Sequence, residues 1–232
     1  MGIEPLALSM LARRRKRLGV LPGGEFARWL HDYLRAQTHG EPAGDVPCGE
    51  CNACCKASYF IPIHSEERET IALIPVARLT RAANTNEPQW ALDQSCGGQC
   101  PMLINDACSI YAQRPRTCRR YDCRVFVATG VGVGSGPRAP VNERVWRWRF
   151  DYPSALDVAT QSAVLAAVAF FRRCADLIDS DIAPSDTGDL AKAAVLVHAL
   201  FLEANVRSDG SDTTLAAAIN GTLRQQLTSA AG

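Results

Sequence analysis

Cysteine is concentrated in one stretch of this sequence. Nine of its ten cysteines lie between positions 48 and 123, and the tenth is Cys174. So many thiols in one segment must be paired, bound to a metal or buried, which leaves few ways for that segment to fold. An odd set does not pair off completely, and a disulfide between the adjacent Cys54 and Cys55 would be strained. The distribution therefore favours thiolates that bind a metal over a disulfide framework.

The first residues do not have the order of a secretory signal. Their apolar part, Leu6 to Leu11, precedes the basic run Arg13 to Arg17, whereas a signal peptide places its basic residues first. The sequence contains no run of about 18 apolar residues, so it does not predict a membrane-spanning helix. We therefore expect a cytoplasmic protein, in which thiols stay reduced and available to metals.

The charges of the chain nearly balance. Lysine and arginine number 25 against 24 acidic residues, so no overall field attracts nucleic acid or an anionic membrane. The basic run 13–17 could touch either of these locally, or it could form the solvated face of a helix. With 47% hydrophobic residues, the composition is that of a globular protein. We expect neither a membrane nor a nucleic acid among its partners.

The first group of cysteines reads Cys48-Gly-Glu-Cys51-Asn-Ala-Cys54-Cys55, a CxxCxxCC pattern. Two intervening residues let the chain turn so that both sulfurs face one ion at about 2.3 Å, and two such steps overlap here. The side chains of the adjacent Cys54 and Cys55 tend to diverge. We therefore expect them to serve different metals, or one of them to be a ligand and the other not.

A second group of cysteines is spread too widely to form one local site, so folding must gather it. Its members are Cys96, Cys100, Cys108, Cys118 and Cys123. Mononuclear zinc and cubane clusters each take four ligands, so nine candidates indicate two four-ligand sites or one polynuclear centre. The four histidines stand at no ligand spacing from a cysteine, and thiolates alone satisfy zinc or clustered iron.

Arginines accompany the second group, at positions 114, 116, 119, 120 and 124. Their positive charge would lower the pKa of nearby thiols and offset the negative charge of a metal–thiolate centre. Alternatively, they would only solvate a helix. The sequence leaves both interpretations open.

The hydrophobic pattern predicts a mainly α fold with a small β-hairpin. The expected helices are 25–38, 154–178, 189–203 and 212–227, the last three capped by Ser154, Asp189 and Asp212. After the first cysteines we expect an extended run at 59–63 and a helix from Ser65 to Leu73. Between Cys100 and Tyr111 we expect a hairpin that turns at Asn105-Asp106. A helix with Pro115 in its first turn should then carry Cys118 and Cys123. Leu21 to Gly24 is expected to interrupt regular secondary structure. We expect a glycine-rich loop at 129–140 and a strand at 145–150.

These expectations divide the chain into three parts. They are a basic N-terminal arm at 1–24, a cysteine-cluster metal-binding domain at 25–150 with an irregular core, and a helical C-terminal region at 151–232. Cys174 lies among apolar residues of the first C-terminal helix, where we expect it to serve packing.

Several ordered elements resemble the zinc- or iron-chelating cysteine-cluster family named for its CxxCxxCC signature. They are the first cysteine group, Cys100-Pro101-Met102-Leu103, Cys108-Ser109-Ile110-Tyr111, Arg114-Pro115, Cys118-Arg119 and Cys123. The resemblance implies a metal-binding module with eight candidate ligands: Cys48, Cys51, Cys54, Cys55, Cys100, Cys108, Cys118 and Cys123. Cys96 is outside the pattern.

The function expected from this resemblance is the binding of zinc or an iron–sulfur cluster through cysteine thiolates. The alternative is an iron–sulfur enzyme related to flagellin lysine methylases, in which a similar cluster serves a methyl transfer. The chain lacks the CxxxCxxC spacing of radical enzymes that cleave S-adenosylmethionine. The sequence thus leaves open whether the protein is an enzyme, and whether a protein partner accompanies the metal ion.

Overall fold

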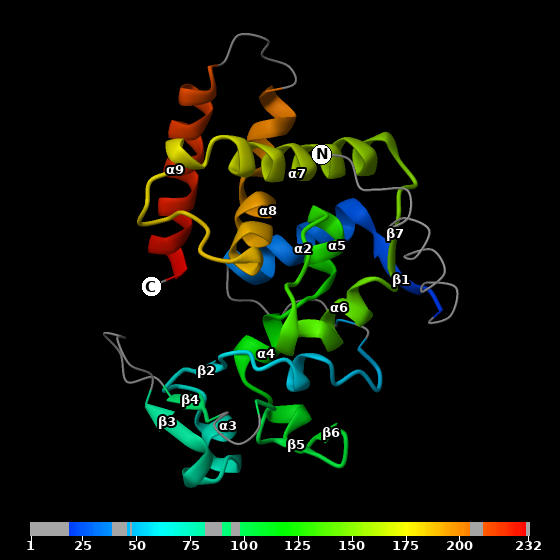
Figure 1. Ribbon diagram of the computed structural model, residues 1–232, viewed down its shortest axis with the longest axis vertical. Helices are drawn as coiled ribbons and strands as arrows, with labels where there is room; N and C mark the ends of the chain where they lie inside the picture. Colours follow the sequence, from blue (N-terminus) through cyan, green and yellow to red (C-terminus); the bar gives the residue numbers. More distant parts are fainter. Residues whose placement is uncertain are drawn as a thin grey trace. The chain divides into compact units, whose positions relative to one another are not determined.

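The computed structural model describes residues 19–38, 46, 48–81, 90–93, 98–204 and 211–230. Within these ranges the chain is mainly helical, with a small hairpin and two other small sheets, which confirms the predicted fold class (Figure 1). It divides into two compact units, described separately below. Unit 1 comprises 1–41, 123–133 and 145–232, and unit 2 comprises 42–122 and 134–144.

Each unit is assembled from segments that are far apart in the sequence. The chain passes from unit 2 to unit 1 between Asp122 and Cys123, returns after Val133, and leaves unit 2 again after Arg144. The three-part division by consecutive sequence stays a prediction, and the basic run 13–17 lies outside the described residues.

Three long helices form most of unit 1. They are α7 (Ala155–Arg173), α8 (Thr187–Ala204) and α9 (Asp212–Ala230), with α7 crossing α8 (Figure 1). Ser154 caps α7 as predicted, in a reciprocal capping box with Asp157. The other predicted caps are wrong by a few residues. Asp186 accepts the backbone N–H of Asp189, and Ser211 accepts that of Thr214, because these earlier residues still lie outside the helix.

Aromatic side chains fill the core of unit 1. Trp148, Phe26 and Phe170 are almost completely buried, and Phe170 meets Phe201 of α8 edge to face at 5.8 Å. α7 ends at Arg173, earlier than predicted, and Cys174 follows it as a buried residue, in keeping with packing. By length and composition α7 could cross a membrane, but core helices meet the same criteria, and 44% of its apolar window is buried.

The predicted break at Leu21–Gly24 is wrong. Strand β1 (Leu21–Glu25) pairs in parallel with β7 (Trp148–Asp151), directly before α2 (Phe26–Thr38), which confirms the first predicted helix. A Cβ atom at Gly23 would lie 2.7 Å from the Arg149 carbonyl oxygen, so glycine permits the close approach of the two strands. The glycines that resemble a chain breaker in the sequence therefore belong to a strand pair.

Unit 2 is built from short elements. Its three-stranded antiparallel sheet has the order β2 (Pro62–Ile63), β4 (Trp90–Leu92) and β3 (Leu79–Arg81). The predicted hairpin is confirmed as β5 (Leu103–Ile104) and β6 (Ala107–Cys108). Its turn residues have positive φ angles of 49° and 59°, as a two-residue type I′ turn requires. A small apolar cluster supports these elements: Ile61, Ile63, Ile74, Leu92, Cys100, Met102 and Ile110.

The helices of the cysteine-rich segment differ from the prediction at their ends. The helix expected from Ser65 is α3 (Arg68–Leu73), preceded by Glu67 at the N-cap position. Pro115 is the N-cap of α4 (Arg116–Arg120) and does not lie in its first turn. α4 ends before Cys123, which begins α5 (Arg124–Thr129) of unit 1, so the two cysteines do not share a helix.

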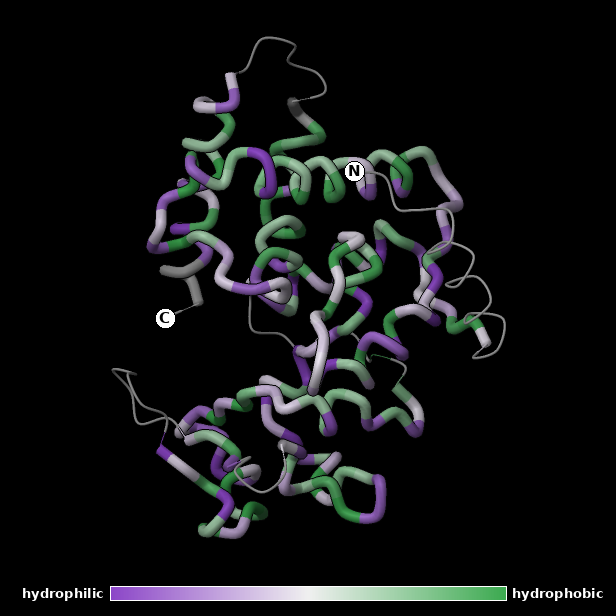
Figure 2. The backbone as a smooth tube through the Cα atoms, in the orientation of Figure 1, coloured by the Kyte–Doolittle hydropathy of each residue, from purple (hydrophilic) through white to green (hydrophobic). Residues whose placement is uncertain are grey.

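The glycine-rich segment is not a loop along its whole length. Its last residues begin α6 (Ala139–Val145), and a short 3-10 turn at Gly136–Arg138 precedes that helix. The predicted strand at 145–150 therefore begins later, at Trp148. Figure 2 shows hydrophobic residues concentrated along α7 and α8 of unit 1.

Candidate metal centre

The CxxCxxCC motif forms two consecutive tight turns. The backbone N–H of Cys51 donates to the Cys48 carbonyl oxygen at 3.0 Å, and Gly49 between them has a positive φ of 54°. The chain then closes a 3-10 turn at Cys54–Lys56, where the N–H of Ala57 donates to the Cys54 carbonyl oxygen at 3.3 Å. Glycine adopts this positive φ at little steric cost, so the backbone turns that the CxxC spacing predicts are present.

A backbone hydrogen bond joins the first cysteine group to the second. The N–H of Cys100 donates to the Cys55 carbonyl oxygen at 2.7 Å. The N–H of Leu103, which begins β5, donates to the Cys100 carbonyl oxygen at 3.0 Å. Cys100 is buried, and Cys55, Cys108 and Cys118 pack against the same apolar cluster. Folding therefore gathers thiols from three separate segments into unit 2.

Two polar residues inside the motif hold it to the hairpin. Asn52 donates from Nδ2 to the Asp106 carbonyl oxygen at 2.8 Å, and Lys56 Nζ lies 2.6 Å from Asp106 Oδ1. These partners lower the pKa of the Asp106 carboxyl, chiefly through the hydrogen bond from Lys56. We call this group the Asp106 clasp. It joins the turn between Cys100 and Cys108 to the loop that carries Cys51 and Cys54.

Hydrogen bonds with neighbouring thiols shift the pKa values of Cys54, Cys55 and Cys100. Those to Cys100 and Cys54 raise the pKa of the Cys55 thiol above its ordinary value. The same bonds to Cys55 lower the pKa of Cys54 and that of Cys100 to about 7 each, although burial opposes this. The expectation that Cys54 and Cys55 serve different metals, or that one of them is a ligand and the other not, stays a prediction.

The remaining thiols of unit 2 are linked to this trio by charge. Burial, then the charges of Cys54 and Cys51, raise the pKa of Cys48 to about 11. Burial, then the charges of Cys54, Cys100 and Cys108, raise the pKa of Cys118 above its ordinary value. The pKa of Cys108 is raised as well, mainly by burial. Seven of the eight candidate ligands thus form one electrostatic network: Cys48, Cys51, Cys54, Cys55, Cys100, Cys108 and Cys118.

The eighth candidate, Cys123, belongs to unit 1. It is 8% exposed, and its sulfur accepts a hydrogen bond from the Trp148 indole N–H at 3.2 Å. Its assignment as a ligand stays a prediction. Cys96, which the resemblance leaves without a role, lies outside the described residues.

The donor chemistry of unit 2 fits a soft metal. All its described cysteines are free thiols, and thiolates are the ligands that zinc and iron–sulfur clusters prefer. Within the described ranges, however, no three histidine, cysteine, aspartate or glutamate side chains already meet as a group that could hold an ion. The thiols are gathered and partly ionised, and coordination of one ion by several of them requires side-chain rearrangement.

The arginines near the second group have different roles. The charge of Arg114 lowers the pKa of Cys108 and of Cys118. Its guanidinium is fixed by a 2.9 Å bond to the Tyr111 carbonyl oxygen and lies 4.1 Å from the centre of the Tyr111 ring. Arg144 of α6 similarly lowers the pKa of Cys48 and donates to its carbonyl oxygen at 3.1 Å.

The other arginines face elsewhere. Arg116 and Arg119 approach the carboxylates of Glu66 and Glu67, whereas Arg124 belongs to unit 1. The charge interpretation therefore applies to Arg114, whereas Arg116 and Arg119 pair with carboxylates, which neither interpretation predicted. No local sequence pattern indicates Arg144 or the Asp106 clasp, because their partners are distant in the chain.

These features define a mainly helical protein with a thiol-rich candidate metal centre. Residues 47–133 match the sequence model of the CxxCxxCC family, described as a putative zinc- or iron-chelating domain. The match confirms the resemblance inferred from the sequence, covers less than half of the chain, and includes the 123–133 segment of unit 1. No curated protein and no solved structure gave a significant match.

Proposed function

We propose that unit 2 binds zinc or iron through cysteine thiolates, either as a structural zinc site or as an iron–sulfur cluster. One observation carries the proposal: Cys55, Cys100, Cys108 and Cys118, which come from three segments of the chain, lie at one apolar cluster of unit 2. Dispersed or disulfide-bonded sulfurs would have argued against it. The family match supports the same chemistry.

The two thiols with pKa values near 7 are suited to begin metal capture. Because their pKa values are lowered, Cys54 and Cys100 lose their protons more readily than ordinary thiols. Further ligands such as Cys55 and Cys118 must release their protons when they coordinate. Arg114 and Arg144 offset part of the negative charge that results. The bound group would then order a segment composed mainly of short elements.

Reduced thiols also support a cytoplasmic location. Every cysteine in the described ranges is free, as expected where cellular reductants keep thiols reduced. We propose a cytoplasmic location on that basis.

The test is the metal content of the chain purified without oxygen. Colourless protein with stoichiometric zinc would favour the structural site, and brown protein that carries iron and absorbs broadly would favour the cluster. We expect Cys54→Ser or Cys100→Ser to lower the metal content. Cys174→Ser is the matched control, because Cys174 is a buried cysteine of unit 1 and should leave the metal content unchanged. Equal metal content in all four proteins, or its absence from the unaltered chain, would refute the proposal.

A further inference from the structure

Cys118 lies on a short helix that does not form without contacts to other segments. α4 has five residues, Arg116–Arg120, and Cys118 is its third. So short a helix makes too few internal hydrogen bonds to form in isolation. Its N-cap residue is Pro115, which provides no side-chain hydrogen bond to the first turn. The position of the Cys118 thiol therefore depends on what other segments supply to this helix.

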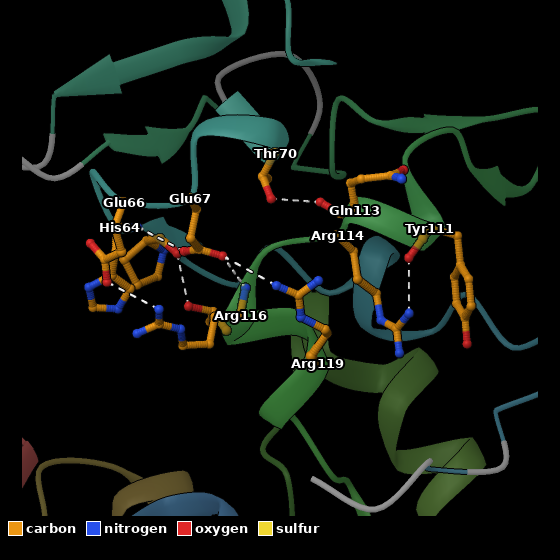
Figure 3. Close-up of polar contacts among 11 residues, drawn as sticks. His64, Glu66, Glu67, Thr70, Tyr111, Gln113, Arg114, Arg116 and Arg119 are labelled. Atoms are coloured by element: carbon orange, nitrogen blue, oxygen red, sulfur yellow. Dashed lines mark hydrogen bonds and ion pairs between the residues drawn. The ribbon is translucent and has the colours of Figure 1, made fainter. Parts of the chain in front are cut away.

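Glu67 supplies the cap from 49 residues earlier in the chain (Figure 3). Its Oε1 accepts the Arg116 backbone N–H at 2.6 Å, and its Oε2 accepts the His64 backbone N–H at 2.9 Å. Arg119 of α4 brings its Nη2 to 3.9 Å from Oε1. Because the Glu67 side chain is only 4% exposed, these donors replace nearly all its contact with water.

We infer that Glu67 is the positioning residue of the candidate metal centre: its carboxylate fixes the first turn of α4 and thereby holds Cys118 among the other thiols of unit 2. The inference rests on the proposed metal binding and identifies what allows Cys118 to take part. A carboxylate suits this role, since it accepts strong charge-assisted bonds from backbone N–H groups and is favoured at a helix N-terminus. The bond to His64 fixes the carboxylate within its own segment, so it orients α4 against that segment.

The neighbouring Glu66 provides a matched control. Its side chain is 53% exposed and its Oε1 lies 3.1 Å from Arg116 Nη2, so it pairs with the side chain of Arg116 and not with the backbone. Figure 3 shows both carboxylates on the same side of α4. Glu66→Ala removes a negative charge from the same neighbourhood and leaves the cap of α4 intact.

Cobalt(II) titration of the full reduced chain tests the inference. Cobalt(II) replaces zinc in thiolate sites and gives ligand-to-metal charge-transfer absorption that increases with the number of thiolates bound. We expect Glu67→Ala to bind cobalt about 10- to 100-fold more weakly, the usual effect of losing a group that orients a ligand. The charge-transfer absorption of the cobalt complex of Glu67→Ala should fall to that of the Cys118→Ser complex. Glu66→Ala should match the unaltered chain, and Glu67→Gln should be intermediate in affinity with an unaltered spectrum, because its amide oxygen still accepts one N–H.

Wild-type affinity and absorption in Glu67→Ala would overturn the inference, as would a Cys118→Ser spectrum identical to that of the unaltered chain. Failure of the unaltered chain to give thiolate absorption would instead refute the proposed function, and the inference with it. If Glu67→Ala does not fold by circular dichroism, Glu67→Gln decides the question. In cobalt-loaded Glu67→Gln, iodoacetamide should modify Cys118 faster than in the cobalt-loaded unaltered chain. An unchanged rate of modification at Cys118 would overturn the inference.

Discussion

The two units differ in the length of their helices and in the size of the side chains that form their cores. Unit 1 contains helices of 18 and 19 residues packed through large aromatic side chains such as Trp148 and Phe170. In the described part of unit 2, the α-helices and strands are at most seven residues long, and the buried members of its apolar cluster are isoleucines, Leu92, Met102 and Cys100. Short elements with a small core usually need an additional constraint, such as a metal or disulfides.

Unit 2 compensates with polar contacts between distant segments. Glu67 caps α4, the Asp106 clasp joins the hairpin to the cysteine motif, and the Thr117 hydroxyl donates to the Pro62 carbonyl oxygen at 2.8 Å. Such bonds fix geometry, but each contributes only about 0.5–1.5 kcal/mol net. Unit 2 is therefore arranged by directional polar contacts and is suited to stabilisation by a bound group. Unit 1, in contrast, is stabilised mainly by the burial of apolar side chains.

The largest effect should come from removing metal. We expect a chelator to reduce the hydrogen-exchange protection of unit 2 by at least about 100-fold, since a ligand held at a hundred times its dissociation constant stabilises by about 2.7 kcal/mol. Peptides from α7 and α8 of unit 1 serve as the internal control and should keep their protection. Hydrogen exchange followed by mass spectrometry, with and without chelator, measures both units in one sample. An equal loss in both units would contradict the comparison.

The next effect should come from the core of unit 1. Phe170 is 1% exposed, so Phe170→Ala should lower the free energy of unfolding by about 3–5 kcal/mol through lost burial and a cavity. Urea unfolding followed by far-ultraviolet circular dichroism measures this, because most of the signal comes from the long helices. Leu165→Ala on the same helix is the control, since Leu165 is 42% exposed and should cost much less. Metal content per folded molecule should be unchanged in both variants. A loss of metal in Phe170→Ala would show that metal binding and the stability of unit 1 are not separable.

The features that the sequence predicted are those with local causes. The apolar stripe of α2, the capping box at Ser154 and the turn at Asn105-Asp106 each depend on residues within a few positions, and all three are confirmed. The gathering of Cys100 and Cys108 near the motif follows from the same hairpin. Which of these cysteines bind a metal stays a prediction.

What the sequence did not reveal depends on contacts between distant residues. Strand β1 exists because β7 lies beside it, which no local pattern shows. The approach of Cys100 to the first cysteine group depends on a hydrogen bond from its backbone N–H to the Cys55 carbonyl oxygen. Glu67 looks in the sequence like an ordinary acid of a first turn, and its role follows only from the approach of Arg116.

The smallest expected effect is a pH dependence confined to unit 1. Asp157 accepts the Ser154 backbone N–H at 3.0 Å and the Ala27 backbone N–H at 2.8 Å, so it caps α7 and also holds the first turn of α2. The hydrogen bond from the Ser154 side chain, then that from Ala27, lower the pKa of Asp157 below its ordinary 3.8. A lowered pKa means that the folded state favours the ionised form. The stabilisation is therefore complete above the ordinary pKa and is lost as the pH falls through the lowered value.

Asp157→Asn should therefore be less stable than the unaltered chain near pH 6, and the difference should shrink as the pH falls below 3.8. Urea unfolding midpoints, measured by circular dichroism over this range, give the difference directly. Asp151→Asn is the control, because Asp151 is exposed at the end of β7 and its loss should give no such pH-dependent difference. A difference that stays constant across the range would mean that the Asp157 carboxylate is not held in its ionised form by folding. The join between α2 and α7 would then depend on apolar packing.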